Sequence, residues 1–159
     1  MGADCWLADT AVVVGDVEMG KNCTVWFSAV LRGDVHHIRI GDQTNIQDNA
    51  TIHCTYQKAP TTIGSNVSIG HNAIVHGCTL EDNVLIGMGA IIMDNAVVQS
   101  GAIVAAGAVV LENTFVEANS IYAGVPARKV KATDESNVTL MERIAGNYVK
   151  YASWFKNEE

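Results

Sequence analysis

Three histidines, His53, His71 and His76, stand at related places in the sequence. His53 and His76 each directly follow an aliphatic residue, whereas His71 comes two places after one. Imidazoles that converge from such positions are common ligands of Zn²⁺ and similar divalent metals. A metal held by three histidines keeps a position open for water and lowers the pKa of that water to about 7. The chemistry that these residues could perform is therefore metal-assisted attack by water.

A repeat of six residues positions these histidines. Aliphatic residues recur at Ile40, Ile46 and Ile52, at Ile63, Ile69 and Val75, and at Ile86, Ile92, Val98, Val104, Val110 and Val116. A sustained short period is typical of solenoids. A helical period of 3.6 residues does not keep this register, but a short strand followed by a turn at Gly, Asn or Asp does. The sequence therefore predicts an all-β solenoid in which three six-residue units form one triangular coil.

The repeated units, such as IGDQTN, IGSNVS and IGHNAI, resemble those of the hexapeptide-repeat superfamily. This resemblance implies a left-handed parallel β-helix, whereas general crossover rules predict the opposite hand. Insertions at His36 and His37 and at residues 54–60 are expected to bulge as loops. From Asp134 onward the apolar spacing is helical, with Thr133 or Asp134 as the N-cap. We expect a β-helix domain at residues 1–130 and a C-terminal α-helix packed on the prism at residues 131–159.

Counting units around the coil assigns the polar residues to faces. Arg32, His53 and His76 fall on one face in three successive coils, about 4.8 Å apart, a spacing that lets two imidazoles share a metal. His71 falls on another face, directly above Asp48. A third ligand on a different face would point away from the pair, so we expect a neighbouring subunit to present its His71. The predicted assembly is a homotrimer with a metal site at each seam.

The composition indicates an ordered protein without nucleic-acid or membrane partners. Hydrophobic residues make up 48% and charged residues 17% of the chain, and the formal net charge is −7. Ten Lys and Arg residues are few for binding nucleic acid or an anionic membrane. No apolar stretch approaches the ~18 residues of a membrane span and no leader pattern is visible, which predicts a cytoplasmic protein. The four widely spaced cysteines are expected to be free thiols.

The order of the polar motifs resembles one family within the superfamily. Leu31-Arg32-Gly33-Asp34, Asn45-Ile46-Gln47-Asp48-Asn49 up to His53, Gly70-His71-Asn72 and Val75-His76-Gly77 are similar to the γ-class carbonic anhydrases. The resemblance implies an enzyme that reversibly hydrates CO₂ to bicarbonate, using hydroxide on a metal at a trimer interface. The implied cofactor is Zn²⁺, with Fe²⁺ or Co²⁺ as alternatives.

The same resemblance gives each motif a role. It makes His53, His71 and His76 the metal ligands. It implies that Arg32 pairs with Asp48 across the subunit seam and so holds the trimer together.

Further roles are implied for catalysis. Gln47 is implied to hydrogen-bond the water or hydroxide on the metal, Asn45 to help position the substrate, and Asp34 to support the site. Tyr122 is a candidate site tyrosine, and the alternative is a structural residue at the last turn of the prism.

The sequence departs from the family where a proton must leave the site. Active members resemble each other in carrying one acidic residue directly after Arg-Gly-Asp and another in the following loop. This chain has Val35 at the first place and no Asp or Glu between residues 54 and 62. His36, His37 or Tyr56 could replace these acids, since an imidazole titrates near pH ~6.5. The alternative for the two histidines is a solvated loop without a role in catalysis.

Two other functions fit the same fold. A CoA-dependent hexapeptide acyltransferase uses one histidine as a general base, and many such enzymes share the ending Gly124-Val125-Pro126-Ala127-Arg128-Lys129-Val130. A catalytically weak metal-binding trimer that serves as a scaffold would explain the missing acidic residues. Saturable CoA binding without metal would indicate the first, and full metal occupancy without turnover would indicate the second.

Overall fold

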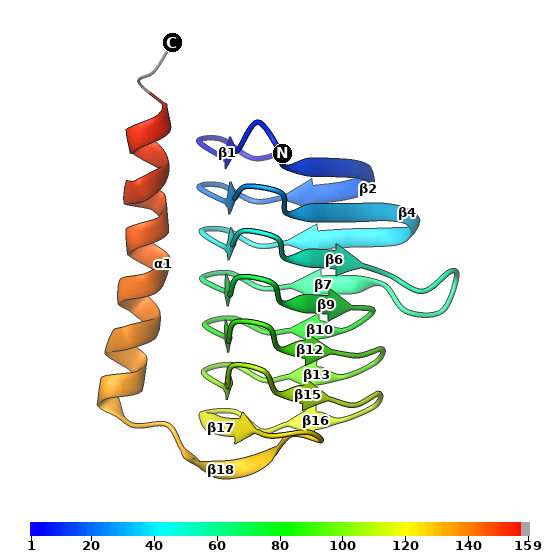
Figure 1. Cartoon of the computed structure of the whole chain (residues 1–159), viewed down its shortest axis with the longest axis vertical. Helices are drawn as coiled ribbons and strands as arrows, with labels where there is room; N and C mark the ends of the chain where they lie inside the picture. The colour runs from blue at the N-terminus through cyan, green and yellow to red at the C-terminus, as the bar shows by residue number, and fades with distance from the viewer. Residues whose placement is uncertain (157–159) are drawn as a thin grey trace.

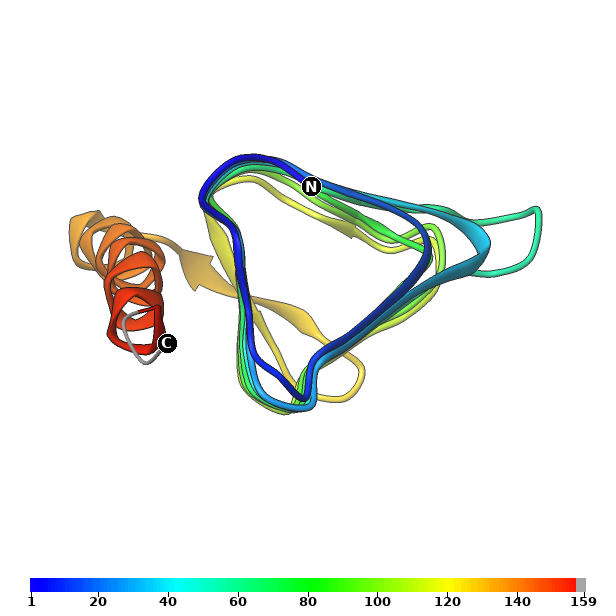
Figure 2. The same ribbon diagram turned by 90° about the horizontal axis from the view of Figure 1, so that it is seen from above.

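The protein is a triangular prism of stacked coils with one helix alongside it, as a computed structural model shows for residues 1–156 (Figure 1). Seen along the prism axis, the coils superpose as a triangle, and the loop around residues 54–60 projects from one corner (Figure 2). Strands pair in parallel from coil to coil. The predicted left-handed parallel β-helix is confirmed.

Two sheets make the three faces of the prism. The first sheet contains, in spatial order, β1 (Trp6–Leu7), β3 (Thr24–Val25), β5 (Asn45–Ile46), β8 (Ser68–Ile69), β11 (Leu85–Ile86), β14 (Ile103–Val104), β17 (Ser120–Ala123) and β18 (Arg128–Ala132). The second contains β15 (Val109–Val110), β12 (Ile91–Ile92), β9 (Ile74–His76), β6 (Thr51–His53), β4 (Val30–Ile40), β7 (Thr61–Ile63), β10 (Thr79–Leu80), β13 (Val97–Val98) and β16 (Phe115–Val116), with β2 (Val12–Met19) paired to β4. All pairs are parallel except β17 with β18, which is antiparallel.

The long strand β4 explains why the second sheet covers two faces. Its first part pairs with β6, and its second part, beyond a corner, pairs with β7. We call the face that contains β6, β9, β12, β15 and the first parts of β2 and β4 the histidine face. The face formed by the first sheet is called the helix face, because α1 packs against it.

The recurring aliphatic residues fill the interior of the prism. Ile46, Ile52, Ile69, Val75, Ile86, Ile92, Val98, Val104, Val110 and Val116 are all 0% exposed. Burying one such side chain contributes roughly 1.5–3 kcal/mol. Short polar residues turn the corners: Asn49 and Asn72 both adopt φ 59°, a left-handed conformation that asparagine tolerates better than most residues. Each six-residue unit thus supplies one buried aliphatic side chain and one residue that adopts the left-handed conformation needed at the corner.

The helix α1 (Glu135–Phe155) is capped at its N-terminus by Asp134, one of the two predicted caps. The Asp134 side chain accepts a hydrogen bond from the backbone N–H of Asn137, whose side chain in turn accepts one from the backbone N–H of Asp134. The buried residues of the helix are Met141, Ala145 and Ala152. The predicted domain boundary after residue 130 falls inside β18, and this division stays a prediction whose last residues, 157–159, lie outside the described part.

Aromatic rings fix the helix to the prism. The ring centroids of Trp26 lie 5.2 Å from those of Tyr148 and 5.9 Å from those of Phe155. Within residues 1–156, no helix is both long and apolar enough to span a membrane. The four cysteines are free, as predicted.

Candidate metal centre

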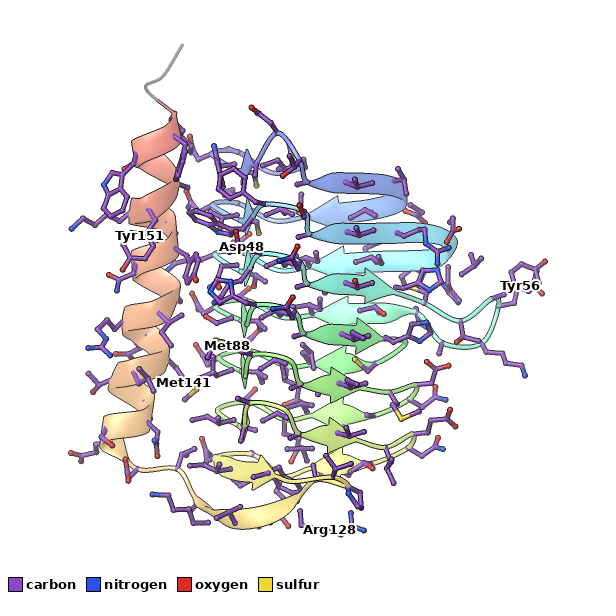
Figure 3. The ribbon with its side chains drawn as sticks, in the orientation of Figure 1. Asp48, Tyr56, Met88, Arg128, Met141 and Tyr151 are labelled. Atoms are coloured by element: carbon purple, nitrogen blue, oxygen red, sulfur yellow. The ribbon has the colours of Figure 1, made fainter. Side chains whose placement is uncertain are left out.

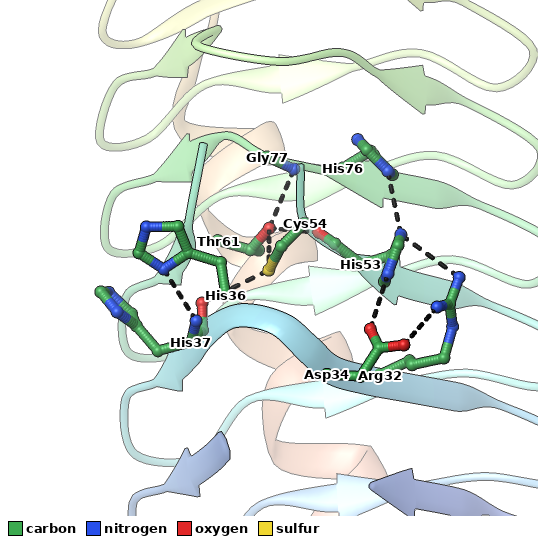
Figure 4. A network of polar contacts seen from close by, with 9 residues as sticks. All are labelled: Arg32, Asp34, His36, His37, His53, Cys54, Thr61, His76 and Gly77. Carbon is green, nitrogen blue, oxygen red and sulfur yellow. Dashed lines mark hydrogen bonds and ion pairs between the residues drawn. The ribbon is translucent and has the colours of Figure 1, made fainter. Parts of the chain in front are cut away.

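Arg32, His53 and His76 lie in one column on the histidine face. Leu31 is paired with Ile52, so that Arg32 comes level with His53, and His53 is paired with His76. The Nδ1 atom of His53 lies 3.1 Å from the Nε2 atom of His76. The two imidazoles therefore turn one nitrogen each toward the other, and Arg32 Nη2 lies 3.5 Å from the same His53 nitrogen (Figure 4).

Asp34 contacts the other ring nitrogen of His53, Nε2. Its Oδ1 atom lies 3.0 Å from His53 Nε2, and its Oδ2 atom accepts a hydrogen bond of 2.7 Å from Arg32 Nη1 (Figure 4). The hydrogen bond from Arg32 is the main cause that lowers the pKa of Asp34 below its usual value. Arg32 thus keeps Asp34 charged and oriented toward His53.

Asp94 contacts the other ring nitrogen of His76, Nδ1, in the same manner. Its Oδ1 atom lies 2.6 Å from His76 Nδ1, and its Oδ2 atom accepts a hydrogen bond from the Thr55 hydroxyl. Burial acts to raise the pKa of Asp94, but the hydrogen bonds from Thr55 and His76 outweigh it and lower the pKa. The sequence did not predict Asp94 as a site residue. We call Arg32, Asp34, His53, His76 and Asp94 the histidine-face half-site.

His71 lies at the corner between the helix face and the histidine face. Its Nδ1 atom is 2.8 Å from Asp48 Oδ2, and its Nε2 atom is 3.4 Å from the hydroxyl of Tyr148 on α1. Burial first, and the charge of Asp48 second, raise the pKa of Tyr148 to about 12. Tyr148 is a second neighbour of the site that sequence reasoning missed, although it lies on the apolar stripe of a correctly predicted helix.

Asn45 and Gln47 lie next to Asp48 on β5 and the turn after it. Gln47 is 6% exposed, and its Nε2 donates a hydrogen bond of 3.0 Å to Asn45 Oδ1. The Nδ2 of Asn45 in turn donates a hydrogen bond of 2.8 Å to the hydroxyl of Ser68 in the next coil. We call Asn45, Gln47, Asp48 and His71 the corner half-site; Figure 3 shows Asp48 on the side of the prism that α1 covers.

Neither half-site is a complete metal site within one chain. In residues 1–156 no hydrogen bond or ion pair joins side chains of the two half-sites, and no three His, Cys, Asp or Glu residues are grouped to hold a metal. The donor chemistry nevertheless fits a divalent metal. In a tetrahedral Zn²⁺ site with Zn–N bonds of about 2.0–2.1 Å, the nitrogens of two imidazole ligands lie ~3.3 Å apart. The distance between His53 Nδ1 and His76 Nε2 is 3.1 Å.

The secondary candidates lie away from both half-sites. Tyr122 is 7% exposed and belongs to the core of the prism. His36 and His37 lie within β4, where it passes a corner, and not in a loop as predicted. Their rings contact each other at 4.6 Å, and the carbonyl oxygen of His37 accepts a hydrogen bond from the Cys54 thiol (Figure 4). Tyr56 is 64% exposed at the end of the projecting loop (Figure 3). Within residues 1–156, none of these side chains is hydrogen-bonded to His53, His71 or His76.

Known proteins resemble the chain over nearly its whole length. A sequence profile described as bacterial transferase hexapeptide (six repeats) matches residues 60–92 and 77–112. The "Probable carbonic anhydrase" of Methanocaldococcus jannaschii is 49% identical over 91% of this chain and 90% of that protein. The chain belongs to the γ-class carbonic anhydrase family.

Two further comparisons describe the extent of this relationship. Gamma carbonic anhydrase 2, mitochondrial, of Arabidopsis thaliana is 39% identical over 98% of this chain, which spans 58% of the length of that protein. A solved hexapeptide transferase family protein from Anaplasma phagocytophilum superposes with a TM-score of 0.85 at 36% identity, covering 97% of this chain and 96% of the other. The relationship therefore extends over nearly the whole β-helix and the helix that follows it.

Proposed function

We propose that the protein is a metal-dependent carbonic anhydrase that reversibly hydrates CO₂ to bicarbonate at the seams of a homotrimer. The resident metal in this proposal is Zn²⁺, which Fe²⁺ or Co²⁺ can replace. One observation carries the proposal: His53 Nδ1 and His76 Nε2 lie 3.1 Å apart, and the other nitrogen of each ring is held by a carboxylate. The His71 of a neighbouring copy would supply the third ligand.

The surface around the histidine-face half-site supports the assembly. Val12, Val14 and Ile74 are 45%, 43% and 38% exposed on the same face. Apolar side chains grouped around a polar site are suited to cover by another protein surface. In this proposal a second copy covers them and brings its corner half-site against the two histidines.

An ion pair across the seam is compatible with the contacts inside one chain. Arg32 already binds Asp34, and Asp48 already binds His71, yet the Arg32 side chain is 46% exposed and the Asp48 side chain 31%. A guanidinium carries five N–H donors. Arg32 can therefore keep its bond to Asp34 and also bind the Asp48 of a neighbouring copy.

The residues have distinct tasks in the proposed reaction. A bound divalent metal supplies a water whose pKa is lowered to about 7. Asp34 and Asp94 hold the outer nitrogens of His53 and His76, so that the inner nitrogens would face a bound metal, with Arg32 Nη2 3.5 Å from His53 Nδ1. Gln47 uses its Nε2 atom to bind Asn45, which leaves its Oε1 atom to accept a hydrogen bond from water at the site. Asn45 holds Gln47 in place.

The first experiment is stopped-flow CO₂ hydration by protein loaded separately with Zn²⁺, Co²⁺ and, without oxygen, Fe²⁺. We expect turnover that depends on the metal and disappears in His71→Ala. The control is Val130→Ala, at a side chain that is 64% exposed on β18 and outside both half-sites, and it should retain turnover. Equal turnover in wild type and His71→Ala would contradict the proposed ligand set.

Mixed trimers test whether the site is shared between copies. His71→Ala keeps an intact pair of His53 and His76, whereas His53→Ala keeps an intact His71. If two neighbours share each site, a mixed trimer regains one of its three seams and about one third of wild-type activity. Two inactive variants that stay inactive after co-refolding into trimers would overturn the shared site.

Other outcomes would support the alternative functions. Saturable CoA binding by metal-free protein, without CO₂ hydration, would favour an acyltransferase. Stoichiometric metal without turnover under any condition would favour a scaffold, and Val35 together with the segment at residues 54–62, which contains no Asp or Glu, would then explain the lost proton transfer. A cytoplasmic location remains a prediction from the sequence.

A further inference from the structure

Asp94 comes from a later coil than the histidine it contacts. Val75, next to His76, is paired with Ile92 on β12, so Met93 is level with His76 and Asp94 lies one place further, at the corner. The carboxylate nevertheless reaches back to His76 Nδ1 at 2.6 Å. Its other oxygen is bound by Thr55, at the start of the projecting loop. Both oxygens of Asp94 are therefore engaged, and its side chain is 19% exposed.

Gly77 makes this reach possible. It has φ +56°, and a Cβ atom placed on it would lie 2.5 Å from Asp94 Oδ1 and 2.8 Å from the Cβ of Ala59. No side chain other than hydrogen fits between the backbone after His76 and the Asp94 carboxylate. The contact between Asp94 and His76 thus depends on the residue that directly follows the histidine.

We infer that Asp94 is a positioning residue of the metal site, which holds the Nδ1–H of His76 and thereby directs His76 Nε2 toward the metal. Thr55 fixes Asp94 in turn and connects the projecting loop to the site. The inference rests on the proposed function insofar as it takes His53 and His76 as metal ligands. It adds to the family motif a residue that lies outside it.

The physical reason is the freedom of an imidazole ring. A histidine can rotate about its side-chain bonds and can carry its hydrogen on either nitrogen. A carboxylate on the outer nitrogen selects the tautomer and the ring orientation, and loss of such a partner weakens metal binding by about 10- to 100-fold. Asp34 plays this part for His53, and Asp94 is the corresponding carboxylate for His76.

The neighbourhood supplies a matched control. Thr55, His76, Asp94 and Glu112 line a cavity of about 330 Å³ on this side of the prism. Glu112 carries the same charge as Asp94 in this cavity, and within residues 1–156 no hydrogen bond or ion pair joins it to a histidine. Glu112→Gln therefore removes one negative charge near the site without removing a contact to His76.

The test compares Zn²⁺ dissociation constants, measured by competition with a chromophoric chelator, for the full-length wild type, Asp94→Ala, Asp94→Asn and Glu112→Gln. We expect Asp94→Ala to bind about 10- to 100-fold more weakly. Asp94→Asn, whose amide oxygen can still accept from Nδ1–H, should be intermediate, and Glu112→Gln should match the wild type. The ¹⁵N shifts of the His76 ring in metal-free protein should show hydrogen on Nδ1 in the wild type and a mixture of tautomers in Asp94→Ala.

The results distinguish the inference from the proposed function. Asp94→Ala with wild-type affinity and an unchanged His76 tautomer overturns the inference, as does an equal loss in Glu112→Gln, which would indicate a general effect of charge. If the unfolding temperature of Asp94→Ala falls far below that of the wild type, Asp94→Asn decides by the same two measurements. Wild type that binds Zn²⁺ but does not hydrate CO₂ contradicts the proposed function and leaves the inference standing. Wild type that binds no Zn²⁺ overturns both.

Discussion

Each of the three histidines has one ring nitrogen against a carboxylate: His53 against Asp34, His71 against Asp48 and His76 against Asp94. The remaining nitrogens of His53 and His76 face each other, and that of His71 lies next to Tyr148. At the scale of single residues, the site is therefore a set of preoriented rings.

Gly77→Ala tests how closely the backbone must approach Asp94. The added Cβ meets Asp94 and Ala59, so we expect lower stability and weaker Zn²⁺ binding. Gly89→Ala is the matched control, because Gly89 also has a left-handed φ, +67°, but a Cβ there meets nothing within 4 Å. Chemical unfolding should show a loss in both variants from the strained φ, whereas chelator competition should show weaker metal binding in Gly77→Ala alone. Equal metal affinities would contradict the role of Gly77.

At the scale of elements, the parts that follow a regular register were predictable and the others were not. The column of Arg32, His53 and His76 follows from counting six-residue units, since parallel strands pair coil upon coil. Asp94 was not predicted because the coil that follows His76 is one residue shorter than the regular eighteen. Met93, and not Asp94, is therefore level with His76 in the next coil. Tyr148 was not predicted because the helical pattern predicts α1 but not its contact with His71.

The cap of α1 gives the helix a dependence on pH. A hydrogen bond from Ser136, and then the backbone N–H of Asn137, lower the pKa of Asp134 below its usual value. A carboxyl group with a lowered pKa in the folded state stabilises the fold above its unfolded pKa, and this contribution is lost as the pH falls through the lowered value. We expect the Asn137 amide to exchange its hydrogen faster, relative to the rest of the helix, below about pH 4. Asp134→Asn, which caps without titrating, should remove this dependence; an unchanged profile would contradict the assignment.

At the scale of the whole molecule, stability and function have separate sources. The interior of the prism is a continuous column of aliphatic side chains, which one chain completes by itself. The proposed metal site is divided between the histidine face and a corner, and within residues 1–156 no three candidate ligands are grouped in one chain. A substitution deep in the prism interior can therefore lower stability without removing any of the three histidines.

Val104→Ala and Val130→Ala form a matched pair for the core. Val104 is 0% exposed in β14, whereas Val130 is 64% exposed in β18. Removing two buried carbon groups at ~0.8 kcal/mol each, with the cavity added, should cost Val104→Ala about 2–3 kcal/mol, and Val130→Ala should change stability by less than about 0.5 kcal/mol. Denaturant unfolding with a constant slope measures both, and equal losses would refute the assigned core.

Metal should stabilise the assembly and not only activate it. A ligand that binds only the native state at a hundred times its dissociation constant stabilises that state by about 2.7 kcal/mol per site. We expect Zn²⁺ to raise the thermal midpoint of the wild type and to shift sedimentation toward the trimer, with neither effect in His71→Ala. A stabilising effect of Zn²⁺ that persists in His71→Ala would indicate a site elsewhere.

The antiparallel strand β18 has a consequence for growth of the coil stack. A parallel β-solenoid exposes unpaired backbone groups at both ends, and such edges invite another chain to add on. Here β18 turns back on β17 at one end (Figure 1). At the other end β2, the edge strand of the second sheet, carries Asp16 and Glu18. Both features oppose end-to-end pairing. A chain cut before Arg128 would lose the first of these barriers and should form elongated fibres.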